Sequence, residues 1–243
     1  MAKYAVLSDI HGNLQALEQV YNDIKLQEIK SVILLGDLID YGMQSNEVVR
    51  FIRDEFEYPI ICNIWGNHEH AIMLSDFSKF ASSRGCQSAK RTAAILDKDV
   101  KIYIQTKLAH AGTLEFTLDA RKCLAVHGSL KDYYWKPILP DNVHGEYTEY
   151  DIVFSGHSHY PHFFMKFYAS NDEKMRNKHA VIFINPGSIG QPRSHHAEAQ
   201  YMIFDSDTQS ADMRSIQYNV KKAMSFFDES VDIFYKNRLE IGI

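Results

Sequence analysis

The sequence predicts an α/β fold built as a sandwich of two sheets. Residues 1–70 alternate strand and helix patterns, residues 70–110 read as helical, and short strands joined by turns follow from residue 113. Alternating strands and helices favour parallel strands with right-handed crossovers, whereas strands joined by short turns favour antiparallel pairs. No repeat, linker or low-complexity segment divides the 243 residues, so we expect one domain spanning 1–243.

The first 70 residues predict three strands and two helices. Apolar residues recur on one face at 13–26 and again at 45–56, which indicates two amphipathic helices. Ser45 is a suitable N-cap for the second helix. Three apolar runs are expected as strands, at residues 3–8, 31–35 and 59–64.

The second half predicts strands and one closing helix. Residues 113–118 and 122–126 flank a short turn and indicate a hairpin. A helix is expected at 219–238, where apolar residues recur with helical spacing. Further strands are expected at 151–155, 161–168, 179–184, 200–205 and 211–218.

Composition excludes some classes of function. The formal net charge is −5 and no block of lysine and arginine occurs, which disfavours stable binding to nucleic acid through a basic surface. No apolar run approaches the roughly 20 residues that cross a bilayer. The chain enters a strand without a signal-peptide pattern, so we expect a cytoplasmic protein with no membrane partner.

Metal-capable side chains follow strand-like runs at five places. In an open α/β sheet the carboxyl ends of strands converge on one crevice, so residues far apart in the chain can meet there. Carboxylate, amide and imidazole groups together suit one or two divalent ions and metal-assisted hydrolysis. The five clusters are Asp9 with His11, Asp37 with Asp40, Asn67 to Glu69, His127, and His157 with His159.

Each cluster alone is a weak signal. Asp9 and His11, like His157 and His159, are two residues apart and can point the same way in extended chain. A turn aspartate or a turn histidine would explain any single cluster equally well. The shared position after a strand favours one site. His68 adjoins Asn67 but points elsewhere in extended chain, where it could donate a proton or contact phosphate.

The ordered blocks resemble the calcineurin-like metallophosphoesterase superfamily. The blocks D-x-H, G-D-x-x-D, G-N-H-E, H-G and G-H-S-H occur in order between residues 9 and 159. Residues 185–193, N-P-G-S-I-G-Q-P-R, resemble the small bacterial and archaeal phosphodiesterase-like branch. The resemblance implies a four-layer α-β-β-α sandwich of two mixed sheets flanked by helices.

The resemblance also implies a site for two divalent metal ions. Manganese or iron is expected, and zinc, nickel and cobalt also suit the ligand set. His68 would be the catalytic histidine that faces the leaving group, and Glu69 would support the site by orienting an imidazole. Asp9, His11 and His159 would hold the first ion, Asn67, His127 and His157 the second, and Asp37 would bridge them.

The implied activity is hydrolysis of a phosphodiester or phosphomonoester of a small molecule or nucleotide, by attack of a metal-bridging hydroxide. One departure concerns Asp40, which is followed by Tyr41-Gly42 where the phosphoprotein-phosphatase branch has Arg-Gly. The missing guanidinium argues against a protein phosphatase. Arg193 is a candidate substitute for binding phosphate, and anchoring of its own loop is the alternative.

Two other functions stay open at this point. One is a non-catalytic scaffold of the same fold, such as a subunit of the retromer complex. The other is a nuclease. The natural substrate, the preference for diester or monoester, the metal, the oligomeric state and the roles of Arg193, His195 and His196 are left open. Tyr133, Tyr134 and Trp135 are expected to pack as a loop rather than to form a substrate wall.

Overall fold

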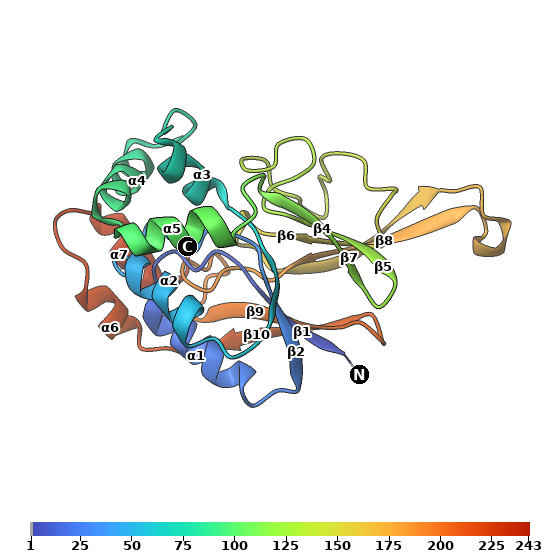
Figure 1. The fold of residues 1–243 in the computed structure, drawn as a ribbon, viewed down its shortest axis with the longest axis horizontal. Helices are drawn as coiled ribbons and strands as arrows, with labels where there is room; N and C mark the ends of the chain where they lie inside the picture. Colours follow the sequence, from blue (N-terminus) through green and yellow to red (C-terminus); the bar gives the residue numbers. More distant parts are fainter. Residues whose placement is uncertain (1) are drawn as a thin grey trace.

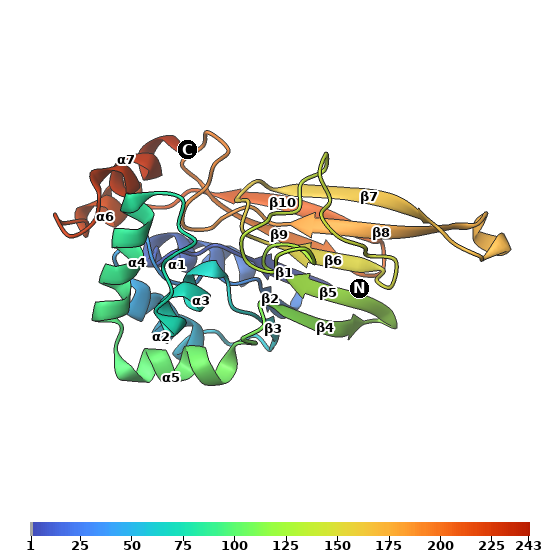
Figure 2. The same ribbon diagram turned by 90° about the horizontal axis from the view of Figure 1, so that it is seen from above.

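The computed structural model describes residues 2–243, and this part of the chain forms two five-stranded sheets. Both sheets combine parallel and antiparallel pairs, and helices flank them, as expected. The helices gather on one side of the molecule, and the ribbon made by β7 (His162–Ala169) and β8 (Lys178–Asn185) projects from the opposite side (Figures 1 and 2).

The first sheet has the order β10-β9-β1-β2-β3. Its parallel part is the predicted β-α-β-α-β unit, and the last two strands of the chain add to it antiparallel. The strands are β1 (Lys3–Leu7), β2 (Ile29–Leu34), β3 (Ile60–Asn63), β9 (Ala199–Asp205) and β10 (Ser210–Ile216).

The second sheet has the order β4-β5-β6-β8-β7, with parallel pairs at its centre and an antiparallel strand at each edge. The loop between β7 and β8 contains a short 3₁₀ turn, η1 (Glu173–Met175). The strands are β4 (Thr113–Leu118), β5 (Arg121–Val126), β6 (Ile152–Ser155), β7 (His162–Ala169) and β8 (Lys178–Asn185).

Side chains alternate along each strand, so one strand contributes to the core on both faces of its sheet. In β1, Tyr4 and Val6 face the second sheet, whereas Ala5 and Leu7 face the helices. The outer face of the second sheet is covered by the segment between β5 and β6, which contributes Tyr147 to a buried cluster. The helices are α1 (Leu14–Ile24), α2 (Ser45–Asp54), α3 (Asn67–Leu74), α4 (Ser83–Ile95), α5 (Lys98–Lys107), α6 (Val220–Ser225) and α7 (Ile233–Ile241).

The single closing helix expected at 219–238 is wrong. Two helices form instead, because polar side chains bind the backbone between them. Asp228 accepts a hydrogen bond from the backbone of Ser230, and Asp232 caps the start of α7 by accepting from Phe234 N. The expected N-cap role of Ser45 is also wrong, because α2 already includes this residue and its hydroxyl accepts from Asp40 N instead.

Within the described range, no helix has both the length and the apolar character needed to span a membrane.

Candidate metal centre

The loops after β1, β2 and β6 have an unusual backbone. The left-handed region costs a residue with a Cβ of order 1–3 kcal/mol, and it persists only where the surroundings impose it. Such strain clusters at functional sites. Five predicted site residues have φ between 48° and 64°, namely Asp9, His11, Asp37, His157 and His159.

Two strand ends come close together because a glycine follows each strand. Gly36 has φ 89°, and a Cβ on it would lie 2.3 Å from the backbone N of Gly66. A Cβ on Gly66 would lie 2.1 Å from Asp37 Oδ1. Only glycine permits this approach, which brings Asp37 and Asn67 to the same place.

One group of donor atoms comes from the loops after β1 and β6. His159 Nε2 lies 3.2 Å from both His11 Nε2 and Asp9 Oδ1. His11 Nε2 lies 3.7 Å from the same oxygen of Asp9. All three side chains are buried, and their arrangement could hold a metal ion.

A second group comes from the start of α3 and from the loops after β5 and β6. Asn67 Oδ1 lies 3.0 Å from His127 Nε2 and 2.9 Å from His157 Nδ1. His127 and His157 also form a candidate metal-binding group with Asp37.

Asp37 lies between the two groups. Its Oδ2 is 3.7 Å from His11 Nε2 and 3.2 Å from His127 Nε2. Its Oδ1 accepts a hydrogen bond of 2.9 Å from His68 N, which fixes the carboxylate. One oxygen therefore faces both groups of donors at once.

Backbone carbonyls orient three of the imidazoles. A ring nitrogen that donates to a carbonyl leaves the other nitrogen with its lone pair, which is the form that binds metals. In each case Nδ1 faces the carbonyl and Nε2 faces the site. The pairs are His127 with Leu35 at 2.6 Å, His159 with Gln191 at 2.6 Å, and His11 with Ile39 at 3.3 Å.

The hydrogen bonds of the Asp9 carboxylate indicate whether a cation fits this site. Its Oδ2 accepts from Ser8 Oγ and from His157 N, at 2.5 and 3.2 Å. Its Oδ1 is buried and has no hydrogen-bond partner within residues 2–243. An unpaired buried oxygen is costly, and a cation among these donors would satisfy it. The residues thus fit a divalent ion with mixed nitrogen and oxygen ligands.

The pKa shifts of the histidines agree with a bound divalent ion. Burial lowers the pKa of His157 to about 3 and holds the pKa of His11 well below its usual value, so both rings are neutral. Burial opposes protonation of His127 as well, but the carboxylate of Asp37 outweighs it and raises the pKa of His127 to about 9. A bound cation would take the place of that proton.

His68 is held by a buried carboxylate. It lies in the first turn of α3, not in extended chain, and its Nδ1 is 2.7 Å from Asp40 Oδ2. Asp40 Oδ1 accepts from Ser88 Oγ at 2.7 Å and from Thr92 Oγ1 at 2.8 Å. These two residues of α4 were not among the site residues expected from the sequence, although their four-residue spacing places both on one face of a helix.

Glu69 supports the backbone rather than an imidazole. Its carboxylate accepts from the backbone N of Gly66 at 2.8 Å and from three consecutive amides after β2. The expected contact with an imidazole is therefore wrong. Glu69 instead joins the turn after β2 to the start of α3.

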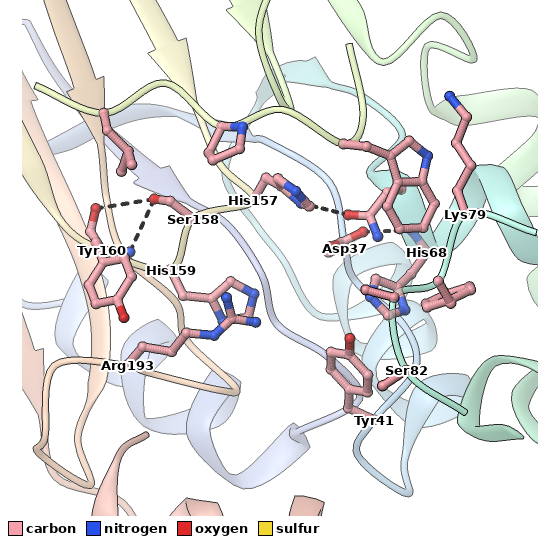
Figure 3. A pocket seen from close by; sticks show the side chains of 16 residues that line it. Asp37, Tyr41, His68, Lys79, Ser82, His157, Ser158, His159, Tyr160 and Arg193 are labelled. Carbon is pink, nitrogen blue, oxygen red and sulfur yellow. Dashed lines mark hydrogen bonds between the residues drawn. The ribbon is translucent and has the colours of Figure 1, made fainter. Parts of the chain in front are cut away.

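A cavity of about 440 Å³ opens beside both donor groups (Figure 3). One wall is aromatic, with the rings of Phe80 and Trp135 5.2 Å apart. Of the three aromatic residues that were expected to pack as a loop, Trp135 also lines this cavity, whereas Tyr133 and Tyr134 are not among its lining residues. The lining residues that carry polar or aromatic groups include Asp37, Tyr41, Asn67, His68, Lys79, Phe80, Trp135, His157, His159, Tyr160 and Arg193.

Arg193 lines the cavity near His159, and Figure 3 shows its side chain extending toward that ring. It makes no hydrogen bond or ion pair with the residues that the structure describes. His195 and His196 follow on an exposed loop and do not line the cavity.

Comparisons with known proteins identify the family of the chain. A family model described as the calcineurin-like phosphoesterase superfamily domain matches residues 2–209. An uncharacterised protein of Methanocaldococcus jannaschii is 32% identical over 232 residues, which cover 90% of this chain and 89% of that protein.

Solved structures share the fold. A hypothetical protein from Pyrococcus horikoshii OT3 superposes with a TM-score of 0.84 at 22% identity, over 100% of this chain and 99% of its own. A metallophosphoesterase from Sphaerobacter thermophilus gives 0.72 at 23% identity, with the same coverage. The family model extends over most of the 243 residues, and the chain therefore belongs to the calcineurin-like phosphoesterase superfamily.

Proposed function

We propose that this protein is a metal-dependent hydrolase that cleaves a phosphodiester or phosphomonoester bond in a small molecule or nucleotide. The observation that carries the proposal is the meeting of both donor groups at Asp37 Oδ2, with His68 beside them. Asp9, His11 and His159 would hold one ion, Asn67, His127 and His157 a second, and Asp37 would bridge them.

The ions would supply an activated water and offset negative charge on the phosphoryl oxygens, as in other two-metal sites. The chain's own contribution includes a proton donor. Because Nδ1 of His68 is bound to Asp40, Nε2 is left to donate to the leaving oxygen. Burial lowers the pKa of His68, but Asp37 and Asp40 outweigh it, and the net shift is upward, which favours the donor form.

The cavity supports a small substrate. Its volume of about 440 Å³ lies in the range of small-molecule sites, roughly 300–1,000 Å³. Phe80 and Trp135 offer an apolar wall for the organic part of the ester, and Arg193 offers a guanidinium for phosphate. These contacts favour an ester of a small organic molecule or nucleotide.

The test is a substrate panel with defined metals. Metal-free protein is reconstituted with Mn²⁺, Fe²⁺, Zn²⁺, Ni²⁺ or Co²⁺ and assayed with bis-p-nitrophenyl phosphate and p-nitrophenyl phosphate, then with nucleotides. We expect metal-dependent turnover, and the ratio of the first two rates gives the diester or monoester preference. Absence of turnover with every metal and ester would refute the proposal and favour a non-catalytic scaffold.

Substitution of Asp37 tests the shared ligand. Asp37→Ala should lose both activity and bound metal, because one carboxylate oxygen faces both donor groups. Metal content is measured by elemental analysis after gel filtration. Asp141→Ala, on an exposed loop, is the control and should keep its metal. Two equivalents retained in Asp37→Ala would contradict the bridging assignment.

A further inference from the structure

Tyr41 stands in a strained turn at the edge of the cavity. Asp40 and Tyr41 have φ of 74° and 60°, two consecutive residues with side chains in the left-handed region. The turn is held in place because Asp40 N donates to Ser45 Oγ at 3.0 Å and Gly42 N donates to His11 O at 3.0 Å. A Cβ on Gly42 would lie 2.3 Å from the same carbonyl, so only glycine fits where the turn packs against the backbone of His11.

This turn directs the Tyr41 ring into the site. The ring stacks on Tyr235 of α7 with centroids 4.4 Å apart. Its other neighbours are the rings of His68 at 4.4 Å and His11 at 4.7 Å. Figure 3 shows the hydroxyl pointing into the cavity, between His68 and Arg193. This hydroxyl makes no hydrogen bond with any residue from 2 to 243.

The hydroxyl of Tyr41 can act as a hydrogen-bond donor. A tyrosine hydroxyl has an ordinary pKa of about 10 and therefore keeps its proton at neutral pH. A protonated hydroxyl can donate to an anionic oxygen.

The charge beside Tyr41 also favours an anion. Burial and the positive charge of Arg193 lower the pKa of Arg238 to about 10. Of these two guanidinium groups, that of Arg193 lines the cavity, so an anion bound there would meet its positive charge.

We propose that Tyr41 is a substrate-contacting residue whose hydroxyl donates a hydrogen bond to a phosphoryl oxygen, with Arg193 binding the same phosphate. This inference rests on the proposed function. The pair occupies the side of the cavity where the sequence has Tyr41-Gly42 in place of Arg-Gly. The competing role is purely structural, with Tyr41 as a spacer between α7 and His68.

The variant Tyr41→Phe separates these roles, because it keeps the ring and its stacking and removes only the hydroxyl. We expect kcat/KM for bis-p-nitrophenyl phosphate to fall about 10- to 100-fold, the range for one hydrogen bond to a charged group. The affinity for inorganic phosphate, measured by calorimetry on metal-loaded protein, should fall by a similar factor. Metal content and Tm should stay at the wild-type values.

Two further variants sharpen the test. Tyr235→Phe makes the same substitution in the same stack, but Tyr235 does not line the cavity, so phosphate affinity should be unchanged. In the double variant Tyr41→Phe with Arg193→Met, the losses should be less than multiplicative, because both side chains are proposed to bind one phosphate.

Phosphate affinity and kcat/KM within twofold of wild type in Tyr41→Phe would overturn the inference while leaving the proposed function intact. A loss that accompanies lower metal content or a lower Tm would indicate the spacer role and would also overturn it. If the wild-type protein hydrolyses no ester, the proposed function fails, and the phosphate titration still decides whether Tyr41 contacts the anion.

Discussion

At the scale of single residues, one buried carboxylate determines how the candidate proton donor is oriented. Asp40 faces His68 with one oxygen and the hydroxyls of Ser88 and Thr92 with the other. A charge-assisted hydrogen bond in the interior is stronger than an exposed one, so the imidazole has little freedom to rotate. Its second nitrogen is thereby directed to the cavity.

His68→Ala should lower kcat by roughly 10²–10⁴, the usual contribution of a general acid. The metal content should stay close to wild type, because the candidate ligands on either side are intact. Turnover is measured with bis-p-nitrophenyl phosphate and metal by elemental analysis. His110→Ala, in an exposed position, is the control. Unchanged kcat in His68→Ala would rule out the role.

A second residue, His162, should make stability depend on pH. Burial lowers the pKa of His162 from 6.5 to about 4. As pH falls through 6.5, the unfolded state binds a proton that the folded state does not, so the unfolding free energy decreases. At pH 5 this residue alone should cost about 2 kcal/mol, from 1.36 kcal/mol per pKa unit.

The comparison uses His162→Leu, which cannot titrate. Urea unfolding of metal-free wild type and variant at pH 7.5 and pH 5 gives two differences in unfolding free energy. The variant should lose about 2 kcal/mol less than wild type on acidification. Equal losses in both proteins would mean that His162 is protonated in the folded state as readily as in the unfolded one.

At the scale of elements, α4 has a role in the site although it contains no metal-capable motif. Its Ser88 and Thr92 are buried and one turn apart, and both donate to Asp40. The helix is N-capped by Ser82, whose hydroxyl accepts from Gly85 N, which fixes where the helix begins. A helix outside the sheets thus determines the orientation of His68.

Thr92→Val should therefore affect both stability and catalysis. Removing one donor from the buried carboxylate should lower the unfolding free energy by about 1–3 kcal/mol, with a reduced kcat. Thr106→Val is the matched control, because the Thr106 hydroxyl donates only to Ile102 O on the exposed face of α5. Equal destabilisation in the two variants, measured in urea, would argue against a special role for Thr92.

At the scale of the whole molecule, the candidate metal centre lies where the two sheets meet. Asp9, His11, Asp37 and Asn67 come from the strand ends of the first sheet, and His127, His157 and His159 from those of the second. Their distances therefore depend on how the sheets pack through the cluster that contains Val6, Ile33 and Phe154. A metal ion bound by residues of both sheets should therefore stabilise the entire fold.

Metal removal tests this coupling. A ligand at 100 times its Kd adds about 2.7 kcal/mol, which for a chain of this size corresponds to roughly 5–10 °C in Tm. Calorimetry of EDTA-treated protein with and without excess Mn²⁺ should show that difference. Asp37→Ala should show a smaller shift. No change in Tm of the wild type with any of the divalent metals would contradict a metal site where the two sheets meet.

Local patterns in the sequence determined the parallel β-α-β-α-β unit, the hairpin of β4 and β5, and the candidate metal ligands that meet between the two sheets. They could do so because apolar strands and the polar residues that follow them are contiguous in the chain. The break between α6 and α7 is local, because Asp228 and Asp232 bind backbone amides two residues further on. The partners of Asp40 and the place of Trp135 in the cavity wall were decided only by the tertiary structure. The reason is physical: Asp40 meets Ser88 and Thr92, and Trp135 meets Phe80, across segments that are distant in the chain, and local patterns do not determine which distant segments meet.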